Sequence, residues 1–214
     1  MKRGQLLLLI VVCFCIFGCK KEKTEGPALN DYLPVTNGSF WKYSYGSDGG
    51  STDTLTITMT GGTTKINGKT YYNATSTYRQ GFSDGYFYAG NHFYATRTVA
   101  LGSNVAMEFQ LLNDTASVGY HWITSPTDDG KVSGIPAQTI NTIMEKGISR
   151  VINGRTFNDV IHTRVELQYS SGAGFQTYIT YDFYLAKGVG LIENDANTLD
   201  SFFEKETLFD YTIK

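Results

Sequence analysis

The sequence predicts an all-β protein, and its composition, its hydrophobic alternation and its turn residues agree on this. Only 18% of the 214 residues are charged, and 23 glycines, 15 tyrosines and 13 phenylalanines stand against 4 prolines and 4 methionines. Such usage is typical of pleated, half-buried surfaces that are interrupted by turns. The low charge argues against a disordered chain, a coiled coil or a charge-driven nucleic-acid binder. We therefore expect a single β domain.

Apolar and polar side chains alternate along most of the chain. In Thr52–Thr60, the side chains of Leu55, Ile57 and Met59 share one face and threonines occupy the other. The same period of two runs through residues 41–45, 105–111, 157–169 and 175–185. One apolar and one polar face per strand is typical of antiparallel sheet, in which one side is buried and the other is wet.

Two-residue turns separate these segments. Asn67-Gly68, Gly90-Asn91 and Asn153-Gly154 each lie between extended runs and supply the positive φ that tight hairpins need. We expect an antiparallel meander of about 10 to 12 strands with little helix. The meander would form a curved sheet, an open barrel or a sandwich, lipocalin-like or clam-like in outline. The segment 197–206 is the one candidate for a helix, of one or two turns.

The chain contains a weak internal sequence repeat. Ile66-Asn67-Gly68-Lys69-Thr70-Tyr71 recurs 86 residues later as Ile152-Asn153-Gly154-Arg155-Thr156-Phe157. Two related halves would explain it, and so would independent use of a favourable hairpin turn.

The N-terminus predicts export and a lipid anchor. Lys2 and Arg3 precede an apolar run of 12 residues, Leu6–Phe17. This run is shorter than the roughly 20 residues that a membrane-spanning helix needs, so it indicates a secretory signal at residues 1–18. The signal ends in Ile16-Phe17-Gly18-Cys19, which resembles the lipobox of bacterial lipoproteins, although Phe17 departs from the small residue usual there. The resemblance implies cleavage before Cys19 and acylation of its thiol, which would hold the chain on a membrane.

Cleavage would change both the cysteine count and the charge. Cys13 and Cys15 lie in the discarded signal and Cys19 would carry lipid, so the mature domain would have no disulfide, cysteine nucleophile or cysteine metal site. Loss of Lys2 and Arg3 leaves 16 basic and 20 acidic residues, a formal charge of −4. Residues 19–30 are expected to form the lipidated cysteine and a flexible tether, and residues 31–214 the β domain.

Three short motifs carry a family resemblance. The first motif, near the start, is Tyr32-Leu33-Pro34-Val35 followed by Gly38-Ser39-Phe40-Trp41-Lys42-Tyr43. The second is Val151–Phe157, in the middle of the chain. The third is Tyr184–Ile192, which includes Gly188-Val189-Gly190-Leu191. Together they resemble a group of uncharacterised secreted lipoproteins of Gram-negative bacteria. The resemblance implies an envelope β-domain of unknown role, and it brings no catalytic residue. We expect the protein to be anchored in the outer membrane. The sequence does not decide whether it lies on the periplasmic or the surface face.

Residues that could carry chemistry are few. His92, His121 and His162 are far apart in the sequence, and none has a neighbour at metal-ligand spacing. No serine lies in a nucleophile motif. Carboxylates for glycoside hydrolysis could come from Glu145, Glu166 or Asp182, although polar strand faces carry such residues routinely. Asp128-Asp129-Gly130 resembles part of a calcium loop but lacks its other ligands, so we interpret it as a turn. We predict no catalytic site, no cofactor and no metal.

The aromatic excess is the remaining signal. Tyrosine and tryptophan recur where ligands or partners dock, and they also form cross-strand pairs that simply stabilise a sheet. We name Trp41, Tyr43, Trp122, Tyr178 and Tyr184 as candidate ligand-binding residues. The first hypothesis is a non-catalytic lipoprotein that binds an apolar or glycan ligand on a concave aromatic face. The second is an accessory lipoprotein that docks another envelope protein without a pocket, and the third and least favoured is an envelope hydrolase.

The lipid anchor can be tested by metabolic labelling with palmitate in the native host. The wild-type chain should take up label, and Cys19→Ala should take up none, because the acylated thiol is gone. Equal labelling of the two chains would contradict a lipid anchor at Cys19.

Overall fold

Thirteen strands make up the regular structure in the described part of the chain, which confirms the all-β class. The computed structural model describes residues 31–47, 52–79, 81–99, 105–198 and 203–214, so the signal, Cys19 and the tether lie outside it. The strands are β1 (Phe40–Ser47), β2 (Thr52–Ile66), β3 (Lys69–Tyr78), β4 (Gly81–Gly90), β5 (Phe93–Val99), β6 (Ala106–Asn113), β7 (His121–Thr124), β8 (Lys131–Val132), β9 (Ile135–Ile152), β10 (Arg155–Ser170), β11 (Phe175–Ala186), β12 (Gly190–Thr198) and β13 (Phe203–Thr212).

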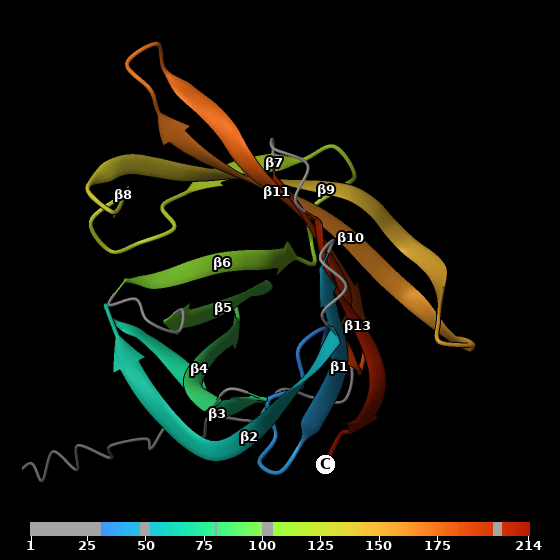
Figure 1. The fold of residues 1–214 in the computed structure, drawn as a ribbon. Coiled ribbons are helices and arrows are strands. Elements are labelled where there is room, and N and C mark those ends of the chain that lie inside the picture. The colour runs from blue at the N-terminus through green and yellow to red at the C-terminus, as the bar shows by residue number, and fades with distance from the viewer. Residues whose placement is uncertain (1–30, 48–51, 80, 100–104, 199–202) are drawn as a thin grey trace, which may run out of the picture.

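The strands form one antiparallel sheet that curls into a nearly closed barrel (Figure 1). Its order is β6-β5-β4-β3-β2-β1-β13-β12-β11-β10-β9-β7, and β8 pairs with β9 off this path. The first and last strands pair with each other, which joins the two ends of the meander. At the seam, β6 lies against β9 and β10, and the Glu108 amide donates to the Pro126 carbonyl at 2.8 Å.

The expected helix at 197–206 is wrong for the described residues of that segment. Residues Asn197 and Thr198 end β12, and Phe203–Glu206 begin β13. Here β13 is hydrogen-bonded on both sides, to β12 and to β1. Two neighbouring strands satisfy its backbone groups, and tertiary pairing overrides a weak local helix preference.

Two of the three expected turns have the expected residues. Asn67 and Asn153 have φ of 49°, and the glycines that follow them have φ of 82° and 77°. Positive φ at both positions is what a type I′ hairpin turn requires. The third turn is displaced by one residue, because Gly90 ends β4 and the positive φ values belong to Asn91 and His92.

The two hairpins that contain the internal sequence repeat are also similar in structure. Asn67 joins β2 to β3 and Asn153 joins β9 to β10, and each pair of strands has a shift in register before its turn. Six residues before each asparagine lies a glycine of positive φ, Gly61 at 78° and Gly147 at 70°. The two hairpins therefore share a turn and an irregularity, and each is followed by a third antiparallel strand.

One contact unites the opening and closing sequence motifs, and we call it the Trp41 clasp. The Trp41 indole nitrogen donates to the Val189 carbonyl at 2.6 Å, and the Tyr43 hydroxyl donates to the Leu191 carbonyl at 2.9 Å. A Cβ atom at Gly190 would lie 3.2 Å from the indole nitrogen, so a glycine is needed beside the ring. The first strand is thereby fixed to the turn between β11 and β12.

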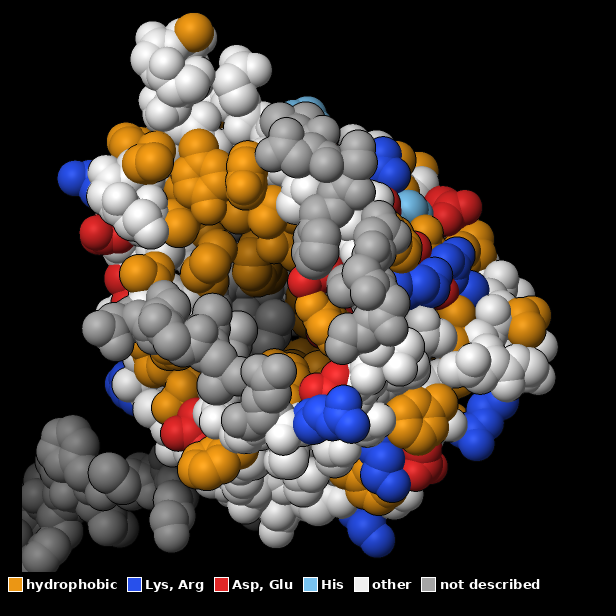
Figure 2. Space-filling model, viewed as in Figure 1, with side chains coloured by type: hydrophobic (Ala, Val, Ile, Leu, Met, Phe, Trp, Pro, Cys, Tyr) orange, Lys and Arg blue, Asp and Glu red, His pale blue; other side chains and the backbone are white. Residues whose placement is uncertain are grey.

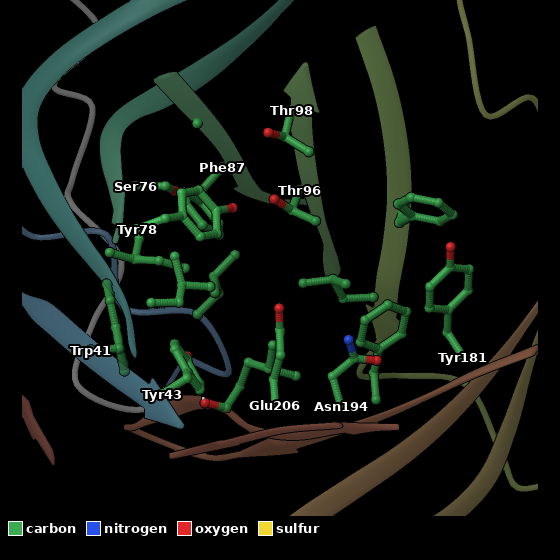
Figure 3. Close-up of a pocket in the computed structure, with 18 residues that line it drawn as sticks. Trp41, Tyr43, Ser76, Tyr78, Phe87, Thr96, Thr98, Tyr181, Asn194 and Glu206 are labelled. Atoms are coloured by element: carbon green, nitrogen blue, oxygen red, sulfur yellow. Dashed lines mark hydrogen bonds between the residues drawn. The ribbon is translucent and has the colours of Figure 1, made fainter. Parts of the chain in front are cut away.

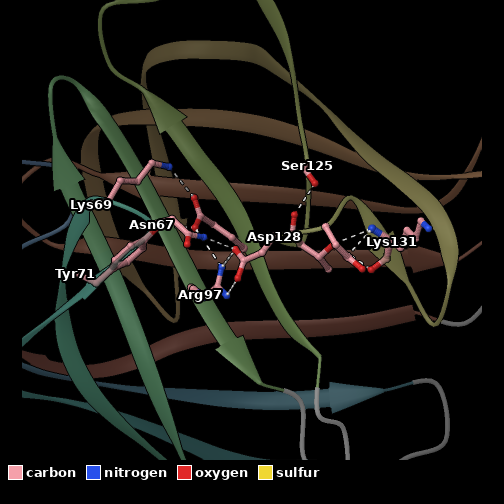
Figure 4. Close-up of polar contacts among 10 residues, drawn as sticks. Asn67, Lys69, Tyr71, Arg97, Ser125, Asp128 and Lys131 are labelled. Atoms are coloured by element: carbon pink, nitrogen blue, oxygen red, sulfur yellow. Dashed lines mark hydrogen bonds and ion pairs between the residues drawn. The ribbon is translucent and has the colours of Figure 1, made fainter.

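The connection from β6 to β9 covers part of the outer face of the barrel. Both Arg97 terminal nitrogens bond to Asp128, at 2.8 and 2.7 Å, and the Asn67 amide donates to the same carboxylate at 2.8 Å (Figure 4). Asp129 accepts the Lys131 amide at 3.0 Å, which makes the segment a turn. Asp128 of the acidic pair that resembled a calcium loop thus holds this segment to the barrel, and Asp129 stabilises its turn.

The end of the β9–β10 hairpin packs against β13 beyond the residues that pair with β12. The Asn153 side chain donates to the Leu208 carbonyl at 2.9 Å, and the Phe157 and Tyr211 ring centroids lie 6.2 Å apart. Figure 1 shows the hairpin curving past the edge of the barrel beside β13. The hairpin contains shifts in register between β9 and β10, and such irregularities bend a strand pair.

The Trp41 clasp predicts unequal costs for two glycine substitutions. Gly190 has φ of 108° and adjoins the indole, whereas Gly154 has φ of 77° and open space around it. Gly154→Ala should cost about 1–2 kcal/mol of unfolding free energy, from backbone strain alone. Gly190→Ala should cost about 1–3 kcal/mol more, because the Trp41 ring must also move. Urea unfolding of both variants measures the difference, and equal costs would contradict a role for the clasp.

Candidate functional site

The barrel interior holds a cavity of about 220 Å³ with mostly apolar walls. Figure 2 shows the hollow opening toward the viewer, surrounded by hydrophobic side chains. Side chains reach it from β1 to β6 and from β11 to β13, because inward-facing residues alternate with outward-facing ones along each strand. Its apolar lining includes Leu33, Trp41, Tyr43, Leu55, Ile57, Tyr78, Phe87, Phe109, Leu111, Tyr181, Phe183 and Leu191.

The aromatic residues present ring surface to the cavity. Trp41 and Tyr43 are 3% and 2% exposed, and their polar atoms are already bonded to the backbone carbonyls of the Trp41 clasp. Burial raises the pKa of both Tyr43 and Tyr181, so these phenols stay uncharged. These rings therefore form an uncharged wall of the cavity.

Two polar side chains from neighbouring strands form a polar floor, which we define as Glu206 and Asn194. These residues pair in register between β13 and β12, and both line the cavity. In Figure 3, Glu206 rises between Tyr43 and Asn194 into the space below Phe87 and Thr96. Enclosure by the barrel raises the pKa of Glu206 to about 7, which a hydrogen bond with Asn194 partly offsets and the nearby Glu204 carboxylate reinforces. The Asn194 side-chain oxygen is buried without a hydrogen-bond partner.

Two of the five candidate binding residues meet in the cavity, and the other three lie elsewhere. Trp41 and Tyr43 line it. Trp122 donates from its indole nitrogen to Gln110 at 2.6 Å and stacks on Tyr120. Tyr178 is 46% exposed on β11 and meets Tyr169 edge-on. Tyr184 is on the outer face, since it pairs in register with His162 and Glu193.

The polar floor was missed because a β-bulge reverses the phase of β13. Phe209, Tyr211 and Ile213 share one face in a regular strand, which would place Glu206 on the wet side. In the structure Lys42 pairs with Asp210 and Tyr43 with Leu208, so Phe209 has no partner and is 39% exposed. Glu206 and Leu208 therefore face inward. The sequence carries no plain sign of this extra residue.

A second polar group lies on the outer face, and we call it the outer ionic cluster. It comprises Glu145, Arg150, His162, Arg164, Asp182, Tyr184, Glu193, Asp195 and Lys205. His162 is 6% exposed, and its two ring nitrogens lie 3.0 Å from Glu145 and 2.7 Å from Asp182. The His162 ring therefore bridges carboxylates from the two strands that flank β10, Glu145 on β9 and Asp182 on β11.

The Tyr184 ring is sandwiched within the outer ionic cluster. The His162 ring stacks on it with centroids 4.3 Å apart, and the Arg150 guanidinium carbon lies 3.5 Å from its centroid. Arg150 also bonds Glu193 at 2.8 Å, and with Lys205 it holds the pKa of this nearly buried carboxyl below its ordinary value despite desolvation. These charges pair with one another under the β9–β10 hairpin, so they act as structural ties.

The histidines are less isolated than the sequence suggests. His92 lies 2.8 Å from Asp114, and His162 bridges two carboxylates, since neighbouring strands bring distant residues together. His121 pairs with Thr142 between β7 and β9. Within the described ranges, no group of three or more histidine, cysteine and acidic side chains is placed to hold a metal ion. Within the same ranges, no helix has the length and hydropathy needed to cross a membrane.

Comparison with solved structures shows relatives of the fold. A candidate lipoprotein from Parabacteroides distasonis superposes with a TM-score of 0.53 at 12% identity, over 87% of this chain and 100% of that one. A candidate exported protein with a YmcC-like fold from Bacteroides fragilis gives 0.52 at 8% identity, over 84% and 98%. These chains share one fold. At such low identity the likeness extends to the fold alone, and no family model and no curated protein matches the sequence.

The raised pKa of Glu206 predicts a pH-dependent stability. Between its ordinary value of 4.5 and about 7, the folded state keeps a proton that the unfolded state has released, so raising the pH through this window favours unfolding. The loss should approach about 3 kcal/mol above pH 7. Thermal unfolding of wild type and Glu206→Gln should show the variant gaining stability relative to wild type as pH rises through this window. A constant difference between the two chains would contradict a raised pKa of Glu206.

Proposed function

We propose that this chain is a non-catalytic envelope lipoprotein, anchored in the outer membrane through Cys19, that binds a small and mainly apolar molecule inside its barrel. The observation that carries the proposal is the cavity bounded by Trp41, Tyr43, Phe87 and Tyr181. Enclosed pockets with apolar walls and a few converging polar groups are the usual form of small-molecule sites. The two fold relatives, a candidate lipoprotein and a candidate exported protein, are consistent with an envelope location.

The size of the cavity bounds the ligand. Its volume of about 220 Å³ exceeds the roughly 150 Å³ of an engineered cavity that holds benzene. It is below the range of about 300–1,000 Å³ that accommodates drug-sized molecules. A single ring or a short acyl chain fits this range, with the remainder of a longer molecule left outside.

The lining favours an apolar ligand over a glycan. A sugar carries hydroxyl groups around its ring, and each of them needs a hydrogen-bond partner once it is buried. The polar side chains that line the cavity are few: Ser76, Thr96, Thr98, Asn194 and Glu206, with the hydroxyls of its tyrosines. Since the Tyr43 hydroxyl is engaged by the backbone, the wall has too few free partners for a sugar ring.

Docking of another envelope protein is the second candidate function. Val118, Tyr120 and Ile123 are 58%, 48% and 60% exposed on one short segment around β7. Exposed apolar side chains that gather in this way favour a protein contact. An envelope hydrolase has less support, because Glu145 and Asp182 are both engaged by His162 on the outer face.

Filling the cavity should abolish binding. Gly85 lines it with an ordinary strand conformation, and a Cβ there would meet its neighbours at 3.6–3.9 Å, so Gly85→Val is accommodated and its methyl groups occupy cavity space. We expect 1-octanol to change the tryptophan fluorescence of the wild type saturably. It should bind Gly85→Val at least about tenfold more weakly, because the added methyl groups remove part of the apolar contact between the ligand and the cavity wall.

Gly46→Val is the matched control for this experiment. Gly46 is also in a regular strand, pairs in register with the outward-facing Lys205, and has only a Thr52 methyl 3.9 Å from its Cβ position. It should bind 1-octanol like the wild type. Identical binding by both variants, or no saturable binding by the wild type, would contradict the cavity as the site. Native mass spectrometry of protein purified from its host would show any molecule that occupies it there, and conversion of a bound ligand would contradict a non-catalytic role.

A further inference from the structure

The polar floor offers hydrogen-bond acceptors without a matching cation. The Glu206 carboxyl projects into the cavity, and the Asn194 side-chain oxygen beside it is buried and has no hydrogen-bond partner. A buried acceptor without a donor destabilises the folded state, so such an atom usually has a partner or a function. Two acceptors next to each other in an apolar cavity favour a ligand that brings donors.

The charged groups around Glu206 do not supply that partner. From β1 the cavity side presents Tyr43 and Tyr45, from β3 Tyr78, and from β11 Tyr181. On β13 itself the nearest group is Glu204, which accepts a hydrogen bond from Tyr45. All of these groups are phenols or carboxyls, and no lysine or arginine lines the cavity in the described ranges.

The nearest basic residues face the other side of the sheet. Lys205 follows Glu204 in the strand and therefore points outward, where it bonds Glu193 and, at 3.1 Å, Asp195. Lys42 on β1 bonds Asp210 at 3.0 Å. The alternation of the strands thus puts the cations outside and leaves the carboxyl of Glu206 inside without a counter-ion.

We propose that the cavity selects a cationic amphiphile, a short apolar molecule whose protonated amine sits between Glu206 and Asn194. This inference rests on the proposed function and adds the chemical class of the ligand. An ammonium group carries three donors, so it satisfies both the carboxylate and the unpaired Asn194 oxygen. The ring faces of the wall attract the same charge, and the apolar chain lies against them.

Other head groups fit the polar floor less well. An alcohol brings one donor, which leaves one of the two acceptors without a partner. A carboxylate places a like charge beside Glu206 in a low-dielectric interior, where repulsion between charges is strong. For the same chain length, the expected order of affinity is therefore amine, then alcohol, then carboxylate.

Octylamine, 1-octanol and octanoate test this order directly, since they share one chain length and differ in the head group. Titration of the mature protein at about pH 8, where Glu206 is ionised, should show octylamine binding at least about tenfold more tightly than 1-octanol, and octanoate most weakly. At about pH 5.5 Glu206 holds its proton, so the preference for the amine should shrink severalfold.

Two matched variants separate the polar floor from general electrostatic attraction. Glu206→Gln keeps the shape of the side chain and should reduce the preference for octylamine to about threefold or less, while 1-octanol still binds. Glu204→Gln removes a carboxyl from the same strand and face but outside the cavity lining, and it should keep the wild-type preference. Binding of 1-octanol by Glu206→Gln shows that this variant is folded with an intact cavity.

Each outcome has one interpretation. Wild-type binding of 1-octanol without a preference for octylamine overturns the cationic ligand and leaves the apolar cavity function standing. A preference that persists in Glu206→Gln, or disappears equally in Glu204→Gln, also overturns the role of the polar floor. If none of the three compounds binds the wild type, the proposed function fails and this inference fails with it.

Discussion

The barrel depends on the contact that fixes its first strand to a turn 148 residues later in the sequence. Trp41 lies against Gly190 and donates to the Val189 carbonyl, and Tyr43 donates to the Leu191 carbonyl. These bonds hold together the region in which β1, β13 and β12 are neighbours. They also engage the polar atoms of both rings, so the Trp41 clasp leaves the cavity wall apolar at this point.

Strand alternation then divides the charges between two environments. Outside, the buried Glu193 has Lys205 beside it, and Arg150 from the β9–β10 hairpin. Inside, Glu206 shares the cavity with an amide, hydroxyls and uncharged phenols, and no lysine or arginine of the described ranges lines it. The opposite pKa directions of the two glutamates, lowered outside and raised inside, follow from the presence or absence of a cation. The inner carboxyl is therefore the one of the two glutamates that has no cation beside it.

The two solved structures with this fold share 12% and 8% of their residues with the chain. A barrel tolerates such divergence because its strands require only alternation, turn chemistry and closure, which many sequences supply. The cavity lining is a separate matter, since a few inward positions decide what it accepts. Function in this protein must therefore be argued from Glu206, Asn194 and the rings around them.

The sequence by itself determined the all-β class, most strand positions and two hairpin turns, because period-two alternation and Asn-Gly pairs act over a few neighbouring residues. It also pointed to Trp41 and Tyr43, and its predictions for the signal and Cys19 concern residues outside the described ranges. Only the tertiary structure decided that β13 replaces a possible helix and that the bulge at Phe209 turns Glu206 inward. Strand pairing over long separations sets both, and no local pattern encodes which residues become partners.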